Sequence, residues 1–469
     1  MYPDALKSWL SCGAITIPPL YLVGGTVRDL LLGDQPKDID LVCRNAKDFA
    51  YGLGRCKKAA VVPMEKKPAE PCYRVIDREH PDNFLDIAEM RGQTIYDDLG
   101  RRDFTINAIA SEVREDGTIG PLLDPFAGAK DIEQKTIKMT GHGSFVSDPL
   151  RILRAARFSA TLGFNIEPQT LDEMRNSAAL LHEVSSERIM TELLLILKTP
   201  HSTAFIKEMD QLGILDVLFP EIPPMKGCEQ NGFHHKDVWE HSLLVAENCE
   251  DILNNLAGYF GDQAEDVSIN LGGNNRLPLL KLTALLHDAG KPLCRGVKAE
   301  SGRITFYRHD KEGAELADAI AERLKLSSLD RGYMVQLIAE HMRVLSLASQ
   351  VARTSAIMRW FRKMQDNAIP AIILGIADVK SSLGKESTAE WRNHYLQWSK
   401  DTVRDYYETI RRRLESKNLV TGSDLISLGV EPGPEMGRLL DILRNAQDAG
   451  EISTREDALA LAKSLLAKI

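Results

Sequence analysis

Two aspartates one residue apart are the first residues in this sequence that could do chemistry together. Asp38 and Asp40 lie in the run KDIDL, which predicts a β-strand. Side chains two positions apart in a strand point to the same face, so both carboxylates could bind the same divalent cations. Exposed acids at the end of a strand are common, and the pair needs a second observation before it indicates a site.

Two adjacent glycines supply that second observation. Gly24 and Gly25 follow an apolar strand-like run and precede a helix that is expected to begin near Thr26. Because glycine has no Cβ, a phosphate could approach the backbone amides at this helix N-terminus. Carboxylates that hold divalent cations beside a triphosphate are what metal-assisted nucleotidyl transfer requires. Asp86, in the strand-like run FLDIAEM, is a candidate third carboxylate.

Further polar residues gather in two motifs later in the chain. They are Arg102, Asp103 and Asn107 in RRDFTINA, and Asp148, Arg151 and Arg154 in SDPLRILRAARF. Arginine forks suit phosphate oxygens, and aspartate or asparagine suits ribose hydroxyls. The residues of the second motif recur every three positions, close to one helical face, where they could offer donors and an acceptor to the edge of a base. Both motifs therefore predict nucleotide binding.

Six of the eleven histidines lie between positions 234 and 341. The candidate metal ligands of this region form the ordered series His241, His287, Asp288, His309, His341 and Asp378. A single histidine is more often a satisfied core or surface residue than a ligand, but an ordered series with carboxylates favours a site for one or two divalent metals. A divalent cation brings the pKa of a bound water toward neutrality, which permits hydrolysis of a phosphoester.

Two kinds of segment must position these groups. Residues 1 to about 140 form an α+β pattern, with expected strands at 21–25, 39–43, 61–63, 73–76 and 84–88. From residue 148 onward, apolar residues recur at three- and four-residue spacing, which predicts helices in nearly all of the remaining chain. A long charged helix is expected from about 386 to 417.

The composition limits the class of protein. The chain has 469 residues, 43% hydrophobic and 27% charged, which excludes a disordered or collagen-like chain. Its formal net charge of −9 argues against a protein that holds nucleic acid through bulk positive charge, so RNA contacts must be local.

The cysteines and the apolar segments indicate the compartment. The seven cysteines are scattered and never spaced CxxC, which favours free thiols in a reducing compartment and disfavours a cysteine zinc site. No apolar stretch is long enough to span a membrane, and the first residues lack the basic start of a signal peptide. We therefore expect a cytoplasmic enzyme with no membrane partner.

The candidate motifs occur in a known order. GGTVRD, DID, RRDFTINA, DPFAGAKDI, DPLRILRAARF and SSERIMTELL follow one another as do the motifs of class II tRNA nucleotidyltransferases, which the chain resembles over residues 21 to about 220. That family contains CCA-adding, CC-adding and A-adding enzymes and bacterial poly(A) polymerases. The histidine series resembles the HD-domain metal phosphohydrolases.

The resemblance implies a fold and a function for each part of the chain. Residues 1–140 would form a nucleotidyltransferase head with a palm-like sheet, 141–222 an all-α neck with the base template, 223–385 an HD-type body and 386–469 a tRNA-binding tail. The enzyme would add the 3′-terminal CCA, or part of it, to tRNA from CTP and ATP with Mg²⁺ and without a nucleic-acid template. The HD body would be a phosphatase or 2′,3′-cyclic phosphodiesterase that uses Ni²⁺, Co²⁺ or Mn²⁺. Whether the protein forms a homodimer is left open.

The resemblance also implies roles for single residues. In the head and neck, the metal-binding catalytic pair would be Asp38 and Asp40, the triphosphate would lie among Gly24, Gly25 and Arg28, and the phosphates and ribose would meet Arg102, Asp103 and Asn107. The incoming base would pair with Asp148 and Arg151, beside Arg154. In the HD body, a first metal would bind His241, His287, Asp288 and Asp378, and a second would use His309 and His341.

Two departures from the family pattern leave the nucleotide specificity open. Ser147 stands where the base-template motif usually has a glutamate. The stretch AEMRGQTIYDDLG is shorter than the segment that CCA-adding members usually carry there, and in this it is similar to CC-adding members. A CC-adding enzyme, an A-adding enzyme and a poly(A) polymerase are therefore alternatives. An alternative of another class is an enzyme that is primarily an HD metal phosphohydrolase, with a head that only binds nucleotide.

Overall fold

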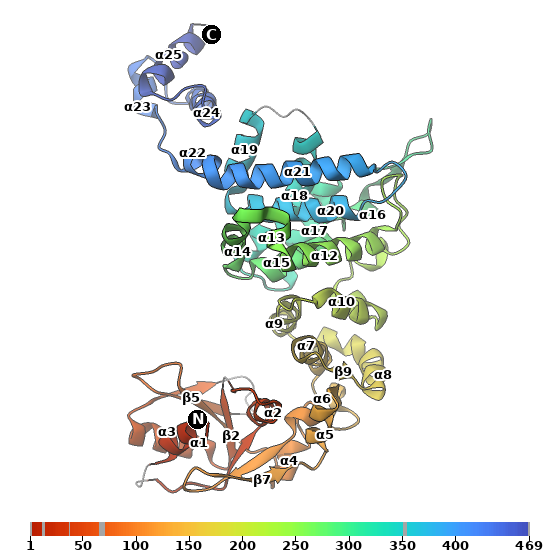
Figure 1. Cartoon of the computed structure of the whole chain (residues 1–469), viewed down its shortest axis with the longest axis vertical. Coiled ribbons are helices and arrows are strands. Elements are labelled where there is room, and N and C mark those ends of the chain that lie inside the picture. The colour runs from red at the N-terminus through yellow and green to blue at the C-terminus, as the bar shows by residue number, and fades with distance from the viewer. Residues whose placement is uncertain (1, 12–14, 37, 65–70, 350–353, 468–469) are drawn as a thin grey trace. The chain divides into compact units, whose positions relative to one another are not determined.

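The computed structural model describes residues 2–11, 15–36, 38–64, 71–349 and 354–467. The chain forms two compact units, Met1–Ser185 with Gln211–Val217, and Ser186–Asp210 with Leu218–Ile469. The first unit combines strands and helices, and the second is almost entirely helical (Figure 1). This arrangement confirms the α+β class and the helical C-terminal part. The division into four segments stays a prediction.

A seven-stranded sheet forms the centre of the first unit, in the order β3, β4, β5, β2, β1, β6, β7. Its strands are β1 (Leu20–Val23), β2 (Ile39–Cys43), β3 (Ala60–Met64), β4 (Cys72–Ile76), β5 (Phe84–Glu89), β6 (Ala110–Val113) and β7 (Ile119–Leu123). Within this sheet, as far as the described residues show, only the neighbours β2 and β5 run parallel. The five predicted strands are present as β1 to β5. The other two were not predicted, because glutamate, glycine and proline interrupt their apolar residues.

Helices connect these strands and follow them. They are α1 (Tyr2–Leu10), α2 (Gly25–Leu32), α3 (Ala46–Lys57), α4 (Ile95–Leu99), α5 (Gly128–Glu133), α6 (Ser144–Ser147), α7 (Arg151–Leu162) and α8 (Pro168–Ser177), with a short parallel pair β8 (Thr136–Ile137) and β9 (Asn165–Ile166). Helix α2 follows β1 directly, which places the paired glycines in the β1–α2 turn. Buried residues of the central strands, such as Leu22, Leu41 and Ile87, form the core of the sheet.

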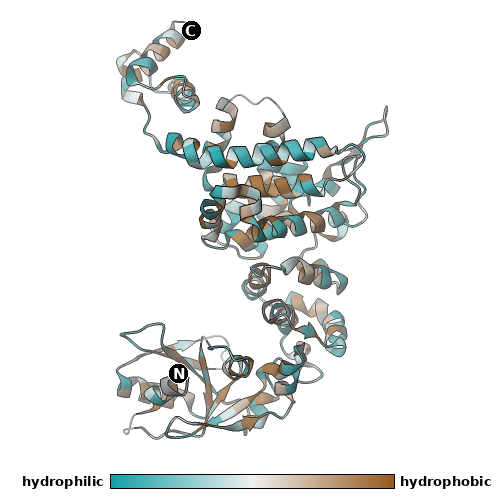
Figure 2. Cartoon of the chain, in the orientation of Figure 1, coloured by the Kyte–Doolittle hydropathy of each residue, from teal (hydrophilic) through white to brown (hydrophobic). Residues whose placement is uncertain are grey.

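The second unit is a helical body followed by a smaller group of helices. The body contains α9 (Ser186–Leu197), α12 (Val238–Asn254), α13 (Leu256–Phe260), α14 (Ala264–Gly272), α15 (Arg276–Leu286), α16 (Lys291–Cys294), α17 (His309–Arg323), α18 (Ser328–Ser349), α19 (Thr354–Met364) and α20 (Ala368–Ser381). Helix α20 is hydrophobic along most of its length (Figure 2) and is packed by α12, α18 and α21 (Ala389–Asp405). It is the central helix of the body.

The long charged helix predicted after residue 386 is present. It consists of α21, a π-helical turn (Tyr406–Ile410) and α22 (Arg411–Glu415), and α21 is mostly hydrophilic (Figure 2). Three further helices follow, α23 (Gly422–Ser427), α24 (Pro434–Ala449) and α25 (Arg455–Leu466), around a small core of their own.

Two features differ from the sequence expectations. A β-hairpin of β10 (Arg295–Val297) and β11 (Ile304–Phe306) interrupts the helices, and three-residue strands are too short to leave a period in the sequence. Five cysteines are free, but Cys56 is disulfide-bonded, so the expectation of free thiols is wrong for that residue, and Cys12 lies outside the described residues. Among the described helices, none is both long and apolar enough to cross a membrane.

Candidate functional site

The aspartate pair lies at the start of β2, next to the helix that begins at the paired glycines. Asp38 directly precedes the strand, and Asp40 is its second residue. The buried hydroxyl of Thr26 on α2 donates a hydrogen bond to the backbone oxygen of Asp38 (2.9 Å) and accepts one from the backbone nitrogen of Asp40 (2.8 Å). A single side chain therefore fixes both aspartates against the β1–α2 turn.

The glycine turn leaves room beside Asp40. Gly24 has a φ of 66°, which favours glycine. A Cβ at Gly24 would lie 2.8 Å from Nη1 of Arg102 and 3.7 Å from Oδ2 of Asp40, and a Cβ at Gly25 would lie 3.6 Å from Nη2 of Arg28. The turn thus faces one carboxylate and two guanidinium groups, as a site for a cation-bound triphosphate should.

Asp86 is aligned with Asp40 but is engaged by an arginine. In the parallel pairing of β2 and β5, Asp40 lies opposite Asp86. Arg74 on β4 donates from Nε and Nη2 to the two oxygens of Asp86, both at 2.8 Å. The bond to Asp86 raises the pKa of Arg74, although burial lowers it, and the charges of Asp86 and Asp38 add to the rise. Asp86 would have to give up its two hydrogen bonds from Arg74 in order to bind a cation.

A continuous chain of hydrogen bonds joins residues from α2, the 3₁₀ turn Thr105–Asn107 and α7. Nη1 of Arg28 donates to Oδ1 of Asn107 (2.8 Å), and Nδ2 of Asn107 donates to Oδ1 of Asp103 (3.0 Å). Arg154 completes the chain with a two-pronged contact to Oδ2 of Asp103 at 2.9 and 2.6 Å. Four predicted nucleotide-binding residues are therefore neighbours in the fold.

Asp103 should make the first unit sensitive to acid. Burial alone would raise its pKa, but the charge of Arg154 and the hydrogen bonds from Asn107 and Arg154 outweigh burial and lower the pKa to about 2. Because the pKa is depressed in the folded state, Asp103 stabilises the fold above pH 4, and this contribution of about 2 kcal/mol is lost as the pH falls from 4 toward 2. We expect the thermal midpoint to fall more between pH 5 and pH 3 in the wild type than in Asp103→Asn. Equal falls would contradict this assignment.

Phe158 on α7 supports the arginines of this network, and the sequence analysis missed it. The guanidinium carbon of Arg157 lies 4.1 Å from its ring centroid, and those of Arg28 and Arg154 lie at 5.3 and 5.4 Å. An aromatic face attracts cations and limits where their side chains can lie. The signal in the sequence was the position of Phe158 one residue after Arg157 and four after Arg154.

Hydrogen bonds hold the two terminal nitrogens of the Arg151 guanidinium, Nη1 and Nη2, which form its outer edge. Its Nη1 donates to Oγ of Ser144 (2.7 Å) and to the backbone oxygen of Arg102 (3.3 Å), and its Nη2 donates to the backbone oxygen of Arg101 (2.6 Å). Burial lowers the pKa of Arg151, and the charges of Asp103 and Asp148 oppose that change. Ser147, at the position of the expected glutamate, donates to the backbone oxygen of Ser144 instead.

The short segment after β5 is closed by hydrogen bonds. A capping box between Thr94 and Asp97 begins α4. The buried carboxylate of Asp98 binds Arg91 (3.3 Å) and Arg102 (2.9 Å). The segment thus ties Arg102, which lies beside Gly24, directly to the end of β5.

The six predicted ligands of the histidine series also come together, although they lie on five helices or helix ends. They are His241 on α12, His287 and Asp288 after α15, His309 at the start of α17, His341 on α18 and Asp378 on α20. All six are buried. Asp288 lies between two groups of ligands, one with His241 and His287 and one with His309 and His341, and within each group the ligand atoms lie within 4.8 Å of one another.

The hydrogen bonds of three histidines leave their Nε2 atoms as acceptors. Nδ1 of His287, His309 and His341 each donates to the backbone oxygen three residues earlier, at 2.8, 2.7 and 2.6 Å. The proton must therefore be on Nδ1, and the Nε2 lone pair points into the cluster.

Neighbouring acceptor atoms in this cluster face one another at short distance. Nε2 of His309 and Nε2 of His341 are 3.2 Å apart, close to the roughly 3.3 Å expected for two nitrogens on one tetrahedral metal. Nε2 of His287 is 3.1 Å from Oδ2 of Asp288, and it has no hydrogen-bond partner among the described residues. Facing lone pairs repel unless a cation lies between them, so these residues fit a divalent metal site.

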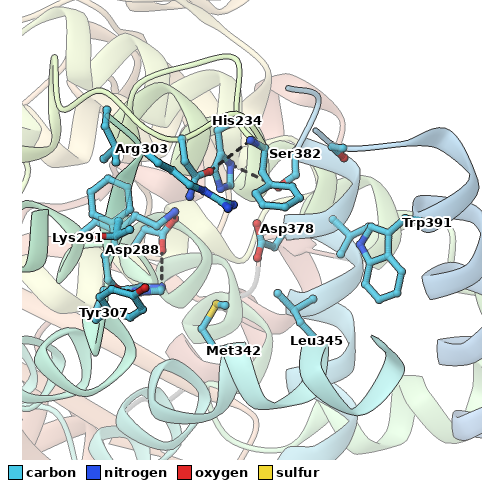
Figure 3. A pocket seen from close by; sticks show the side chains of 18 of the residues that line it. His234, Asp288, Lys291, Arg303, Tyr307, Met342, Leu345, Asp378, Ser382 and Trp391 are labelled. Atoms are coloured by element: carbon cyan, nitrogen blue, oxygen red, sulfur yellow. Dashed lines mark hydrogen bonds and ion pairs between the residues drawn. The ribbon is translucent and has the colours of Figure 1, made fainter. Parts of the chain in front are cut away.

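A pocket of about 490 Å³ opens beside the ligands (Figure 3). Asp288, His309 and Asp378 are among the residues that line it, and Lys291, Lys298 and Arg303 add positive charge. His234 was not predicted as a site residue, but its ring lies 4.4 Å from that of His241. Burial, with the charges of Lys291 and His241, lowers the pKa of His234 to about 2, so this imidazole is neutral.

Three domain families match the sequence. The poly(A) polymerase head domain matches residues 20–138, the probable RNA- and SrmB-binding site of polymerase A matches residues 163–225, and the HD domain matches residues 238–383. Fold, motifs and sites thus define a nucleotidyltransferase that is joined to an HD domain.

The chain belongs to the tRNA nucleotidyltransferase family. It is 32% identical to an A-adding tRNA nucleotidyltransferase of Deinococcus radiodurans over 94% of both chains. It is 28% identical to a CC-adding enzyme of Thermus thermophilus, over 93% of this chain and 92% of that one. It is 30% identical to a multifunctional CCA protein of Xanthomonas campestris, over 93% of this chain and 100% of that one.

Solved structures share the fold over nearly the whole chain. The Thermotoga maritima CCA-adding enzyme complexed with tRNA has a TM-score of 0.66 at 23% identity, covering 99% of this chain and 95% of that one. A CCA-adding enzyme complexed with CTP has a TM-score of 0.68 at the same identity and coverage.

Proposed function

We propose that this enzyme adds the two cytidines of the CCA triplet to the 3′ end of tRNA from CTP. Among its relatives are A-adding, CC-adding and multifunctional CCA proteins, so family membership alone does not select one of these reactions. The observation that carries the choice is the closed segment after β5 together with the fixed outer edge of Arg151. Both features favour a base template that keeps a single conformation.

The proposed chemistry is in-line transfer of a nucleotidyl group. The 3′ hydroxyl of the RNA attacks the α-phosphate of CTP, and pyrophosphate leaves. Asp38 and Asp40 would hold Mg²⁺, which when bound neutralises the triphosphate and lowers the pKa of the attacking hydroxyl. Arg28 and Arg102, at the paired glycines, would bind phosphate oxygens and stabilise the leaving pyrophosphate.

The base would be chosen by Asp148 and Arg151. Cytosine and adenine present different patterns of donors and acceptors, so a template that serves both must shift when the base changes. Here four hydrogen bonds hold Arg151. The segment after β5 is held by the ion pairs of Asp98 with Arg91 and Arg102. Neither the bonds of Arg151 nor these ion pairs favour a shift of the template.

Three tRNA transcripts test this proposal. One lacks the triplet, one ends after the first C and one ends after the second C, and each is offered CTP or ATP before the products are sized. We expect CTP to extend the first two transcripts as far as the second C, and ATP to extend none. Extension of the third transcript by ATP alone would favour the second candidate, A addition, which the name of the D. radiodurans relative supports.

We also propose a second activity, the divalent-metal-dependent hydrolysis of phosphoesters, including 2′,3′-cyclic nucleotides, in the pocket beside the histidines. His241, His287, Asp288 and Asp378 would hold one metal, and His309 and His341 would hold a second. A divalent cation, when bound, supplies water activation, with Mn²⁺, Ni²⁺ and Co²⁺ as candidates. Lys291 would bind the phosphate, since its Nζ lies 2.6 Å from Asp288 at the edge of the ligand cluster.

Metal binding should stabilise the protein. At a free metal concentration of about 100 times Kd, we expect Mn²⁺ or Ni²⁺ to raise the thermal midpoint of the metal-free protein by about 5 °C. His287→Ala should reduce this rise, because it removes a ligand of the first metal, whereas His80→Ala, at an exposed histidine of the first unit, should leave the rise intact. A rise of equal size in the two variants would rule out the histidine cluster as its source.

A further inference from the structure

We infer that Ser144 is a positioning residue for base selection, through its hydrogen bond to Arg151. This inference rests on the proposed function, in which Arg151 meets the incoming base. Ser144 is the first residue of α6 and is buried. Its hydroxyl accepts from Nη1 of Arg151 at 2.7 Å and lies 3.5 Å from the backbone oxygen of Asp103, to which it donates. The hydroxyl therefore links the Arg151 guanidinium to the backbone of Asp103, whose carboxylate pairs with Arg154.

The distribution of bonds around Arg151 shows which edge is left for a ligand. Nη1 donates to the hydroxyl and the backbone oxygen of Ser144 and to the backbone oxygen of Arg102, and Nη2 donates to that of Arg101. No described residue accepts a hydrogen bond from Nε. A guanidinium presents donors in a rigid fork, so fixing its outer edge orients the Nε edge. Without the Ser144 bond, the Arg151 guanidinium could rotate, and its free N–H donors would no longer be aligned with the edge of a base.

Ser144 also accounts for the missing glutamate of the template motif. Ser147, at that position, donates to the backbone oxygen of Ser144 at 2.8 Å, within the same four-residue helix. A neutral hydroxyl one turn earlier contacts Arg151 in place of a carboxylate.

Four variants test this role. Ser144→Ala should raise the KM for CTP about ten-fold and lower the preference for CTP over ATP by a similar factor, because a buried hydrogen bond to a charged group is lost. Ser144→Thr keeps the hydroxyl and should restore most of the preference. Ser147→Ala removes the neighbouring hydroxyl and should change neither quantity. An unchanged thermal unfolding profile serves as the measure that each variant is folded.

Arg151→Ala separates this inference from the proposed function. If Arg151→Ala keeps the preference for CTP, the proposed role of Arg151 is wrong. If Arg151→Ala loses the preference but Ser144→Ala keeps it, the role of Ser144 is wrong. The role of Ser144 is also wrong if Ser147→Ala loses as much of the preference for CTP as Ser144→Ala does.

A second inference comes from the pocket beside the histidines, and it rests on the proposed hydrolase activity. We propose that Trp391 binds the base of a nucleotide substrate whose phosphate lies at the ligand cluster. Figure 3 shows Trp391 and Leu345 on one side of the pocket and Lys291, Arg303 and Asp288 on the other. A pocket of about 490 Å³ with one cationic side and one apolar side suits a phosphoester that carries a flat group.

Trp391 comes from outside the segment that matches the HD family. It lies in the first turn of α21, whereas the HD match ends at residue 383. Tyr395, one turn later, is fully buried, and its hydroxyl lies so close to Gly375 of α20 that a Cβ there would collide with it. This close contact fixes α21 against α20 and therefore holds Trp391 at the pocket.

Two tryptophans on one helix provide the test. With Mn²⁺ bound, Trp391→Ala should raise the KM for 2′,3′-cyclic AMP about ten-fold, since stacking of a base on an aromatic ring is worth about 1–3 kcal/mol. The KM for glycerol 2-phosphate should stay within two-fold, roughly, because this small ester carries no ring that could stack on Trp391. Trp391→Phe should keep most of the affinity, and Trp398→Ala, on the same helix but away from the pocket lining, should change neither KM.

The outcomes are distinguishable. If the wild type with Mn²⁺ hydrolyses neither substrate, the proposed hydrolase is wrong. If it hydrolyses both and Trp391→Ala changes neither KM, or raises both equally, the base-binding role of Trp391 is wrong.

Discussion

Replacing Asp40 with alanine is expected to lower the incorporation of CMP into tRNA about a thousand-fold or more, and to leave hydrolysis in the histidine pocket unchanged. Asp40 is the carboxylate that faces both glycines of the β1–α2 turn, because its Oδ2 lies 3.7 Å from the position that a Cβ would take at either one. Its loss removes a proposed ligand of the cation that neutralises the triphosphate. The measurement is the single-turnover rate with radiolabelled CTP.

The matched control for this variant is Asp34→Ala, at an exposed acid just beyond α2. It should incorporate CMP at the wild-type rate. Two results would contradict the account: Asp40→Ala with wild-type incorporation, or Asp40→Ala with both activities lost while its thermal unfolding is unchanged.

Asp288→Asn is expected to have the opposite effect, with hydrolysis lowered about a thousand-fold and CMP incorporation unchanged. Asp288 belongs to both groups of ligands, so a single change weakens both proposed metals. Asparagine keeps the volume of the side chain, whereas alanine would leave a cavity beside Lys291.

Asp318→Asn is the control for this second variant, because Asp318 lies on α17 outside the cluster and pairs with Arg331 on the surface. Its hydrolysis rate should match that of the wild type. Retention of hydrolysis by Asp288→Asn would show that the histidine cluster is not the hydrolytic centre.

The sequence predicted some contacts of the two sites but not others. The spacing of Asp38, Asp40 and the paired glycines indicated one neighbourhood, because a strand and the preceding turn fix local geometry. The fork from Arg74 to Asp86 was not predictable, since it depends on the antiparallel register of β4 and β5. Arg74 lies in no motif, and only the sheet brings it to a carboxylate.

The histidine cluster shows the same limit. Its six residues could be proposed as metal ligands because the residue types themselves indicate metal chemistry, and their role as ligands stays a prediction. His234 and Trp391 could not be assigned, since a lone histidine in a turn and a tryptophan on a charged helix carry no such signal. Their place at the pocket follows from packing, above all from Tyr395 against Gly375. The fold class was predictable because period-two and period-3.6 patterns separate cleanly near residue 148.

The most direct test of the central claim is a sulfur substitution at the α-phosphate of CTP, with CMP incorporation into tRNA measured in Mg²⁺ and in Mn²⁺. If a cation held by Asp38 and Asp40 contacts the reacting phosphate, one sulfur diastereomer should react at least ten-fold, roughly, more slowly with Mg²⁺, and Mn²⁺ should restore most of the rate, because Mn²⁺ accepts sulfur more readily. An equal sulfur effect with both metals, for both diastereomers, would contradict the claim that these two aspartates place a metal ion on the nucleotide.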